Sequence, residues 1–161
     1  MTDVREVRED ELERWIGVAR AALDEADTVE GYLDWKRQAR QTVWLLASDA
    51  GREVGTAIGV GGWHSPEGVA RGEIRVIGAE RGRGVGSALL GELSVWARRL
   101  GYAELMGPVK EVDAESLAWT ERRGFVEVTD LGPGLAAERA HEAELGLDAV
   151  GPRIVMRRDL T

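Results

Sequence analysis

Residues 81–87 combine three glycines with two arginines and follow, three residues later, an apolar run that ends at Ile77. The apolar run predicts a strand, and apolar side chains recur at helical spacing after Ser87, so the glycines lie in a strand-to-helix turn. The first backbone N–H groups of a helix have no acceptor inside the helix and attract anions. Glycines let a phosphate approach these groups closely, and arginines add positive charge. The segment therefore predicts a turn that binds a diphosphate.

Three phosphate-binding motifs can be compared with this turn. The P-loop requires a lysine before a hydroxyl residue, and no lysine precedes Ser87. The dinucleotide motif G-x-G-x-x-G fails in both registers, because Ser87 or Leu89 stands where the last glycine belongs. The third motif, Arg/Gln-x-x-Gly-x-Gly/Ala after a strand, fits residues 81–86 in full. A glycine-rich turn that binds nothing is the alternative interpretation.

The rest of the chain predicts strands and helices that hold this turn in place. Asp10 and Glu13 have the spacing of a capping box and indicate the start of the first helix. The apolar patterns predict helices at 12–23, 28–41, 85–100 and 114–123, with helical character around 135–145, and strands at 4–8, 42–48, 54–63, 70–77, 103–109, 125–129 and 153–159. This order predicts an α/β or α+β fold with a mixed sheet, in a single domain of residues 1–161.

Composition excludes several classes of function. The chain has 161 residues, 43% of them hydrophobic, and no cysteine, which rules out a disulfide scaffold and a cysteine nucleophile. With two histidines, it offers little material for a metal site, and we expect none. A net charge of −8 argues against a nucleic-acid partner. Because no apolar run is long enough to span a membrane and no signal peptide is evident, we expect a cytoplasmic protein with no membrane contact.

A second segment strengthens the interpretation of the turn. Residues 109–125, VKEVDAESLAWTERRGF, predict a helix that ends in Gly124-Phe125 and leads into a strand. Together with residues 81–86, this segment resembles the GNAT superfamily of N-acetyltransferases, most strongly over residues 70–129. The resemblance implies a GNAT-like fold, whose twisted mixed sheet is flanked by helices and splayed at the cofactor strand. It also implies acetyl-coenzyme A as the acetyl donor.

The resemblance places coenzyme A on the strand end and the turn. Backbone N–H groups at the end of the strand 73–78 would bind the pantetheine arm and polarise the thioester carbonyl. We expect the sheet to splay near residues 76–78 so that this arm can insert. The expected cofactor-binding residues are Val76, Ile77, Gly78, Arg81, Gly82, Arg83, Gly84, Val85, Gly86 and Ser87.

The implied reaction is direct attack of a primary amine on the thioester. The amine is protonated at pH 7 and must lose a proton, so we expect a carboxylate near the cofactor strand to act as the base. Glu73 is the first candidate, with a solvent-facing surface charge as its alternative role, and Glu67 and Glu111 are weaker candidates. Thr120 stands where many relatives have a tyrosine that protonates the leaving thiolate, and a threonine hydroxyl is too weak an acid for this step.

The acceptor is the least defined part of the interpretation. Trp15, Trp44 and Trp96 have a core register. The residues expected to contact the substrate are Tyr32, Trp35, Trp63, His64 and Trp119. A core role is the alternative for these three tryptophans, and a surface position is the alternative for His64. Residues 131–151 enlarge the final hairpin that the family has on the acceptor side. We expect a small-molecule or peptide amine as the acceptor, and a homodimer stays open. A non-catalytic acetyl-coenzyme A or coenzyme A sensor is the alternative function, because Thr120 replaces a proton donor.

Overall fold

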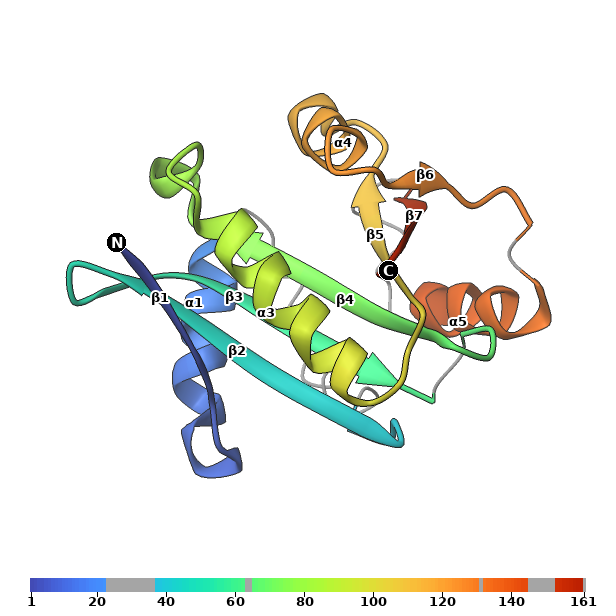
Figure 1. Cartoon of the computed structure of the whole chain (residues 1–161), viewed down its shortest axis with the longest axis horizontal. Helices are drawn as coiled ribbons and strands as arrows, with labels where there is room; N and C mark the ends of the chain where they lie inside the picture. Colours follow the sequence, from blue (N-terminus) through green and yellow to red (C-terminus); the bar gives the residue numbers. More distant parts are fainter. Residues whose placement is uncertain (23–36, 63–64, 131, 145–152, 161) are drawn as a thin grey trace.

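The structure is a computed structural model that describes residues 1–22, 37–62, 65–130, 132–144 and 153–160. These ranges form a seven-stranded sheet with helices on both faces (Figure 1). No helix in these ranges is both long and apolar enough to cross a membrane. The helices are α1 (Leu12–Ala22), α3 (Val85–Arg99), α4 (Ala114–Glu121) and α5 (Gly132–Glu144), with 3₁₀ turns η1 (Glu9–Glu11) and η2 (Gly78–Glu80). The strands are β1 (Thr2–Glu6), β2 (Gln41–Asp49), β3 (Arg52–Gly61), β4 (Val69–Val76), β5 (Glu104–Lys110), β6 (Val126–Glu127) and β7 (Arg153–Asp159).

The sheet has the strand order β1-β2-β3-β4-β5-β7-β6. Neighbouring strands are antiparallel except β4 and β5, which are parallel and are joined through α3. A parallel pair needs a long crossover connection, and α3 supplies it. The predicted mixed sheet is therefore confirmed.

Several predicted element boundaries were wrong. The proposed capping box of Asp10 and Glu13 does not form, because η1 precedes α1 and the Glu11 carboxylate accepts a hydrogen bond from the backbone N–H of Arg8 at 3.4 Å. Strand β6, predicted over residues 125–129, has only two residues instead of five. Most of the predicted helix 28–41 lies outside the described residues.

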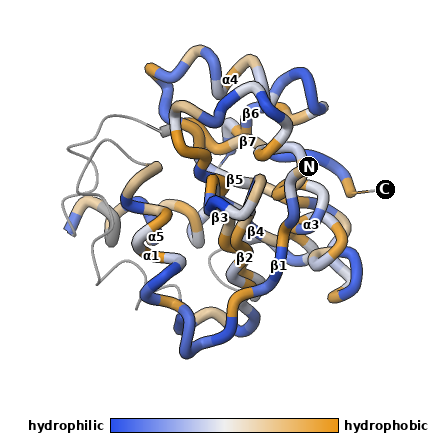
Figure 2. The backbone as a smooth tube through the Cα atoms, turned by 90° about the vertical axis from the view of Figure 1, so that its left-hand side faces the viewer, coloured by the Kyte–Doolittle hydropathy of each residue, from blue (hydrophilic) through white to orange (hydrophobic). Residues whose placement is uncertain are grey.

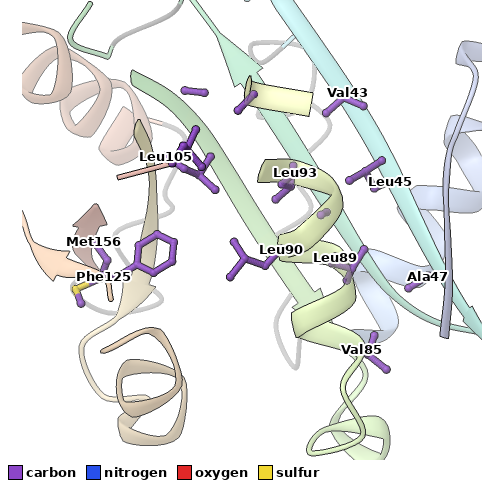
Figure 3. Packing of buried hydrophobic residues seen from close by; sticks show 14 of the residues in the cluster. Val43, Leu45, Ala47, Val85, Leu89, Leu90, Leu93, Leu105, Phe125 and Met156 are labelled. Atoms are coloured by element: carbon purple, nitrogen blue, oxygen red, sulfur yellow. The ribbon is translucent and has the colours of Figure 1, made fainter. Parts of the chain in front are cut away.

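Helix α3 covers one face of the sheet. Its buried stripe includes Leu89, Leu90 and Leu93, which are at most 5% exposed. Figure 3 shows Leu89 and Leu93 near β2 and β3, while Leu90 points toward the part of the sheet that carries Phe125 and Met156. This helix therefore spans the two halves of the sheet, and its first turn is fixed relative to both.

Helices α1 and α5 cover the opposite face, as Figure 2 shows on the side of the strands away from α3. The indole N–H of Trp15 in α1 donates to the carbonyl oxygens of Leu45 and Ala57, at 3.0 and 3.2 Å, and its ring packs edge-on against Trp44. The predicted core roles of Trp15 and Trp44 are confirmed. Helix α5, the predicted insertion in the final hairpin, packs Leu135 against Met106 of β5.

Strands β4 and β5 pair over only three positions, from Val69↔Glu104 to Arg71↔Met106, and then separate. Two glycines lie where the pairing ends. A β-carbon on Gly107 would lie 2.2 Å from the carbonyl oxygen of Gly72, so the strands touch there through bare backbone. The predicted splay is confirmed, but it begins at Gly72 and not near residues 76–78. Residues 72–76 of β4 therefore present an edge that does not pair with β5.

We expect the substitution Gly107→Ala to destabilise the protein. Its β-carbon would force the carbonyl of Gly72 away, and overpacking of this kind costs about 1–3 kcal/mol. Urea denaturation followed by tryptophan fluorescence measures the change in the free energy of unfolding.

Gly91→Ala is the matched control. Gly91 lies in α3 with open space around its β-carbon position, so alanine should raise stability by up to about 1 kcal/mol through its helix propensity. An unchanged stability of Gly107→Ala would mean that the close contact of the two strands is not required.

Candidate active site

A cavity of about 970 Å³ opens where β4 and β5 separate. Its lining includes Leu90 and Leu93 of α3 and also Ala21 and Ala22 of α1. Because α3 and α1 cover opposite faces of the sheet, the cavity passes between the two strands from one face to the other. A long, thin ligand could thus enter on the α3 face and present its end on the α1 face.

The turn between β4 and α3 has the geometry that its glycines predict. Gly82 and Gly84 have φ angles of 80° and 86°, in the left-handed region that glycine adopts without strain. The first backbone bond of α3 runs from the N–H of Ala88 to the carbonyl of Gly84, at 3.0 Å. The N–H groups of the preceding three residues therefore have no acceptor within the helix. These residues line the cavity, so the predicted strand-to-helix turn is formed and its N–H groups lie beside the cavity.

The structure brings most of the predicted cofactor residues to this cavity. Val76, Gly78, Arg81, Gly82, Gly84, Val85, Gly86 and Ser87 line it. Ile77 does not line this cavity, and its N–H donates to the carbonyl of Val54 at 2.9 Å. Arg83 does not line it either, and its guanidinium pairs with Glu80 at 2.9 Å.

The two arginines of the turn have different surroundings. Glu80 is 7% exposed and pairs with both Arg83 and Arg52, and its hydrogen bond with Arg83 raises the pKa of that guanidinium. The charge of Arg83 is thus already matched within the protein. Arg81 instead extends into the cavity and lies 3.7 Å from Asp113 and 3.8 Å from Glu115. Of the two, Arg81 is the one placed to meet an anion.

Helix α4 forms the wall opposite the turn, and Asp113 caps its first residues. The Asp113 carboxylate accepts hydrogen bonds from the N–H and the hydroxyl of Ser116, at 3.0 and 2.7 Å. Burial raises the pKa of the Asp113 carboxyl, but the hydrogen bonds from Ser116 and the charges of Arg81 and Lys110 outweigh burial and lower the pKa below its usual value. Asp113 is therefore an anion that holds Arg81 across the mouth of the cavity.

Trp119 and Arg123 dock α4 onto the first turn of α3. A β-carbon on Gly86 would lie 3.2 Å from the ring of Trp119. The Arg123 guanidinium stacks on that ring, 3.9 Å from its centroid, and donates to the hydroxyl of Ser87 at 2.6 Å. Burial and the neighbouring charge of Arg122 lower the pKa of Arg123, which forms no ion pair with any described residue.

Comparison with known proteins identifies the class to which this site belongs. A family model described as the acetyltransferase (GNAT) family matches residues 4–125. The chain belongs to the GNAT acetyltransferase family. Acetyl-coenzyme A is the acetyl donor of this family, and the expected fold and enzyme class are confirmed. No curated protein matches the chain in sequence.

Solved structures share the fold over the whole chain. The ribosomal-protein-S18-alanine N-acetyltransferase from Escherichia coli has a TM-score of 0.69 at 19% identity, covering 100% of this chain and 95% of that one. Ard1 from Thermoplasma volcanium has a TM-score of 0.69 at 20% identity, covering 99% and 98% of the two chains. The PaiA N-acetyltransferase from Thermoplasma acidophilum, solved with coenzyme A, has a TM-score of 0.66 at 14% identity and covers 99% of each chain.

In this GNAT acetyltransferase, Glu73 lies in the cavity and is 9% exposed. Its carboxylate accepts a hydrogen bond from Nη2 of Arg75 at 3.0 Å. The alternative role of Glu73 as a solvent-facing charge is therefore wrong. Glu67 and Glu111, the weaker candidates, are exposed and do not line the cavity.

Thr120 of the acetyltransferase lines the cavity, but its hydroxyl is engaged by its own helix. The oxygen lies 3.0 Å from the carbonyl oxygen of Ser116 and 2.8 Å from that of Leu117. The hydroxyl proton therefore points to the backbone and not to a ligand. This geometry agrees with the expectation that Thr120 is a poor proton donor.

Only one of the five residues expected to contact the substrate lies in the described part of the chain. Trp119 lines the cavity, at the end formed by the first turn of α3. The other four, Tyr32, Trp35, Trp63 and His64, lie outside the described residues. Sequence analysis missed Arg123, although its spacing of four from Trp119 on one helix predicts that the two side chains are neighbours.

We expect the stabilising effect of the Asp113 charge to disappear in acid. A carboxyl group with a lowered pKa in the folded state adds stability above its unfolded pKa, and this stability is lost as pH falls through the folded-state pKa. Asp113→Asn keeps the helix cap and removes the charge. At pH 7 the wild-type protein should exceed this variant in unfolding free energy by up to about 1 kcal/mol.

The difference should shrink steadily once the pH falls below about 3.9, the usual pKa of an aspartate. Urea denaturation of both proteins across the acid range measures it. A difference that does not change with pH would contradict the role given to this charge.

Proposed function

We propose that this acetyltransferase moves the acetyl group of acetyl-coenzyme A to a primary amine of a small molecule or peptide, by direct attack of the amine on the thioester. The observation that carries the proposal is the single cavity that joins three features. These are the free N–H groups at the start of α3, the unpaired edge of β4 and the carboxylate of Glu73 on the opposite face. Proteins of similar structure include a ribosomal-protein-alanine N-acetyltransferase and a protein described as a putative phosphinothricin N-acetyltransferase, which supports both a peptide and a small-molecule amine as the acceptor.

The residues of the cavity fit coenzyme A. The N–H groups of residues 85–87 and the guanidinium of Arg81 would bind the diphosphate, because a helix N-terminus and a cation both favour negative charge. The edge of β4 over residues 72–76 offers backbone groups that do not pair with β5. An amide-containing arm such as pantetheine would add to this edge in the manner of a further strand.

Bound acetyl-coenzyme A supplies the thioester whose carbonyl carbon the amine attacks. The chain contributes mainly position, since holding an amine in line with a carbonyl removes much of the entropic barrier. Backbone N–H groups at the end of β4 would donate to the carbonyl oxygen and stabilise the negative charge that develops on it.

Glu73 would take the proton from the incoming ammonium group, either directly or through one water molecule. It comes from β4, the strand whose edge binds the acetyl donor, and is buried on the face toward α1. No acid from Thr120 is needed, because a thiol has a pKa of about 8.5 and water can return the proton to the thiolate. In the alternative of a non-catalytic sensor, Glu73 would serve only as the partner of Arg75.

We expect Arg81→Glu to weaken coenzyme A binding severely. Titration calorimetry should give the wild-type protein a binding free energy on the order of −7 to −8 kcal/mol, a micromolar affinity. The variant loses a charge-assisted hydrogen bond and places a third carboxylate beside Asp113 and Glu115, so its affinity should fall at least about tenfold. Arg99→Glu, an equal charge change on an exposed residue near the end of α3, should leave the affinity unchanged. Equal affinities of all three proteins would exclude this turn as the diphosphate site.

We expect Glu73→Gln to lower kcat by about 10²–10⁴-fold at pH 7, the usual cost of removing a general base. The loss should be much smaller at high pH, where free amine is abundant. Thr120→Val should change kcat only a few-fold. The kcat of both variants is measured across a range of pH by detecting the thiol that acetyl transfer releases from acetyl-coenzyme A. Loss of turnover in Thr120→Val with full turnover in Glu73→Gln would reverse the assignment.

A further inference from the structure

Strand β4 carries three charged side chains toward the face that α1 and α5 cover. Arg71, Glu73 and Arg75 alternate along the strand with residues that face α3. Arg71 is 4% exposed, Glu73 is 9% exposed, and the side chain of Arg75 is 14% exposed. Charged side chains are rarely buried to this degree without a partner or a function. Two of the three, Glu73 and Arg75, line the cavity.

Arg71, the first of these three residues, has its charge paired by a carboxylate of α5, the insertion in the final hairpin. Arg71 forms an ion pair with Glu138 of α5, and Glu138 is 2% exposed. Arg71 does not line the cavity, so this pair serves to dock α5 on the sheet. Of the two arginines in this row, Arg75 is therefore the one that lines the cavity.

Arg75 has hydrogen-bonding capacity that the protein does not use. Its Nη2 donates to Glu73, whereas its Nη1 is buried and has no hydrogen-bond partner in the described part of the chain. Its neighbour across the β3–β4 pair is Thr56, which is uncharged and 0% exposed, so β3 supplies no second carboxylate. A guanidinium group has five N–H donors, and buried donors are normally satisfied.

We propose that the acceptor carries a carboxylate close to its amine, as a free amino acid does, and that Arg75 binds this carboxylate. Side chains two residues apart on a strand point to the same face about 7 Å apart, so an amine at Glu73 would bring a nearby carboxylate to Arg75. Arginine pairs with carboxylates through two parallel hydrogen bonds. The same cation would repel acceptors that bear only positive charge, such as polyamines. This inference rests on the proposed acetyl transfer and defines its substrate class.

The test compares each L-amino acid with its own carboxamide as the acceptor, with spermidine included. Thiol release from acetyl-coenzyme A gives kcat/KM for the wild-type protein, Arg75→Met, Arg75→Lys and the control Arg99→Met. In the wild type, the best amino acid should exceed its amide by about 10²-fold or more. Arg75→Met should abolish this preference by raising KM for the acid, Arg75→Lys should restore part of it, and Arg99→Met should retain it.

Two results would overturn the inference. One is acetylation of amides or spermidine by the wild type at least as efficiently as amino acids. The other is an equal loss of kcat for acids and amides in Arg75→Met, which would mean that Arg75 only positions Glu73. Saturation-transfer NMR on the coenzyme A-loaded protein gives a readout without turnover. Binding of amino acids that depends on Arg75, without acetylation of any amine, would support the ligand class and overturn the proposed transfer.

Discussion

The contact between the backbones of Gly72 and Gly107 determines where the sheet opens. Up to that contact β4 and β5 pair as ordinary parallel strands, and beyond it each strand pairs only with its other neighbour. A parallel sheet that stayed closed would leave no edge to bind an extended ligand and no passage between its faces. Because the first turn of α3 follows directly on β4, the opening also lies next to free N–H groups. The anion site and the passage through the sheet are thus two results of one constraint.

The separation of the strands also divides the charges of the site between two faces. On the α3 face, Arg81 is held between the turn and α4 by carboxylates that a diphosphate would displace, while Arg83 is kept neutralised by Glu80. On the α1 face, Glu73 and Arg75 lie side by side next to the cavity. In the proposed reaction, Arg81 would bind the anionic acetyl donor, and the pair of Glu73 and Arg75 would bind the acceptor. The overall charge of −8 reveals neither arrangement.

Sequence reasoning succeeded where the structure depends on neighbours along the chain. The turn at residues 81–87 could be predicted because glycine conformation, helix N-terminal N–H groups and the preceding strand are all local. The start of the splay was placed four residues too late, since it depends on Gly72 meeting Gly107, which is distant in the sequence. The Arg71–Glu138 pair was invisible for the same reason. The ion pair of Glu80 with Arg83 could have been predicted, because a spacing of three residues allows the two side chains to meet across one turn.

An NMR titration of the ¹⁵N-labelled protein with coenzyme A shows whether the turn and the open edge of β4 bind the cofactor together. We expect the largest amide shifts at residues 82–87, where the helix N-terminus would meet the diphosphate, and at residues 72–76, where the open edge of β4 would meet the pantetheine arm. Amides of β1 and β2, which lie across the sheet from the opening, should barely shift. Saturable binding that leaves the amides of residues 72–76 and 82–87 unshifted would mean that coenzyme A binds elsewhere on the protein.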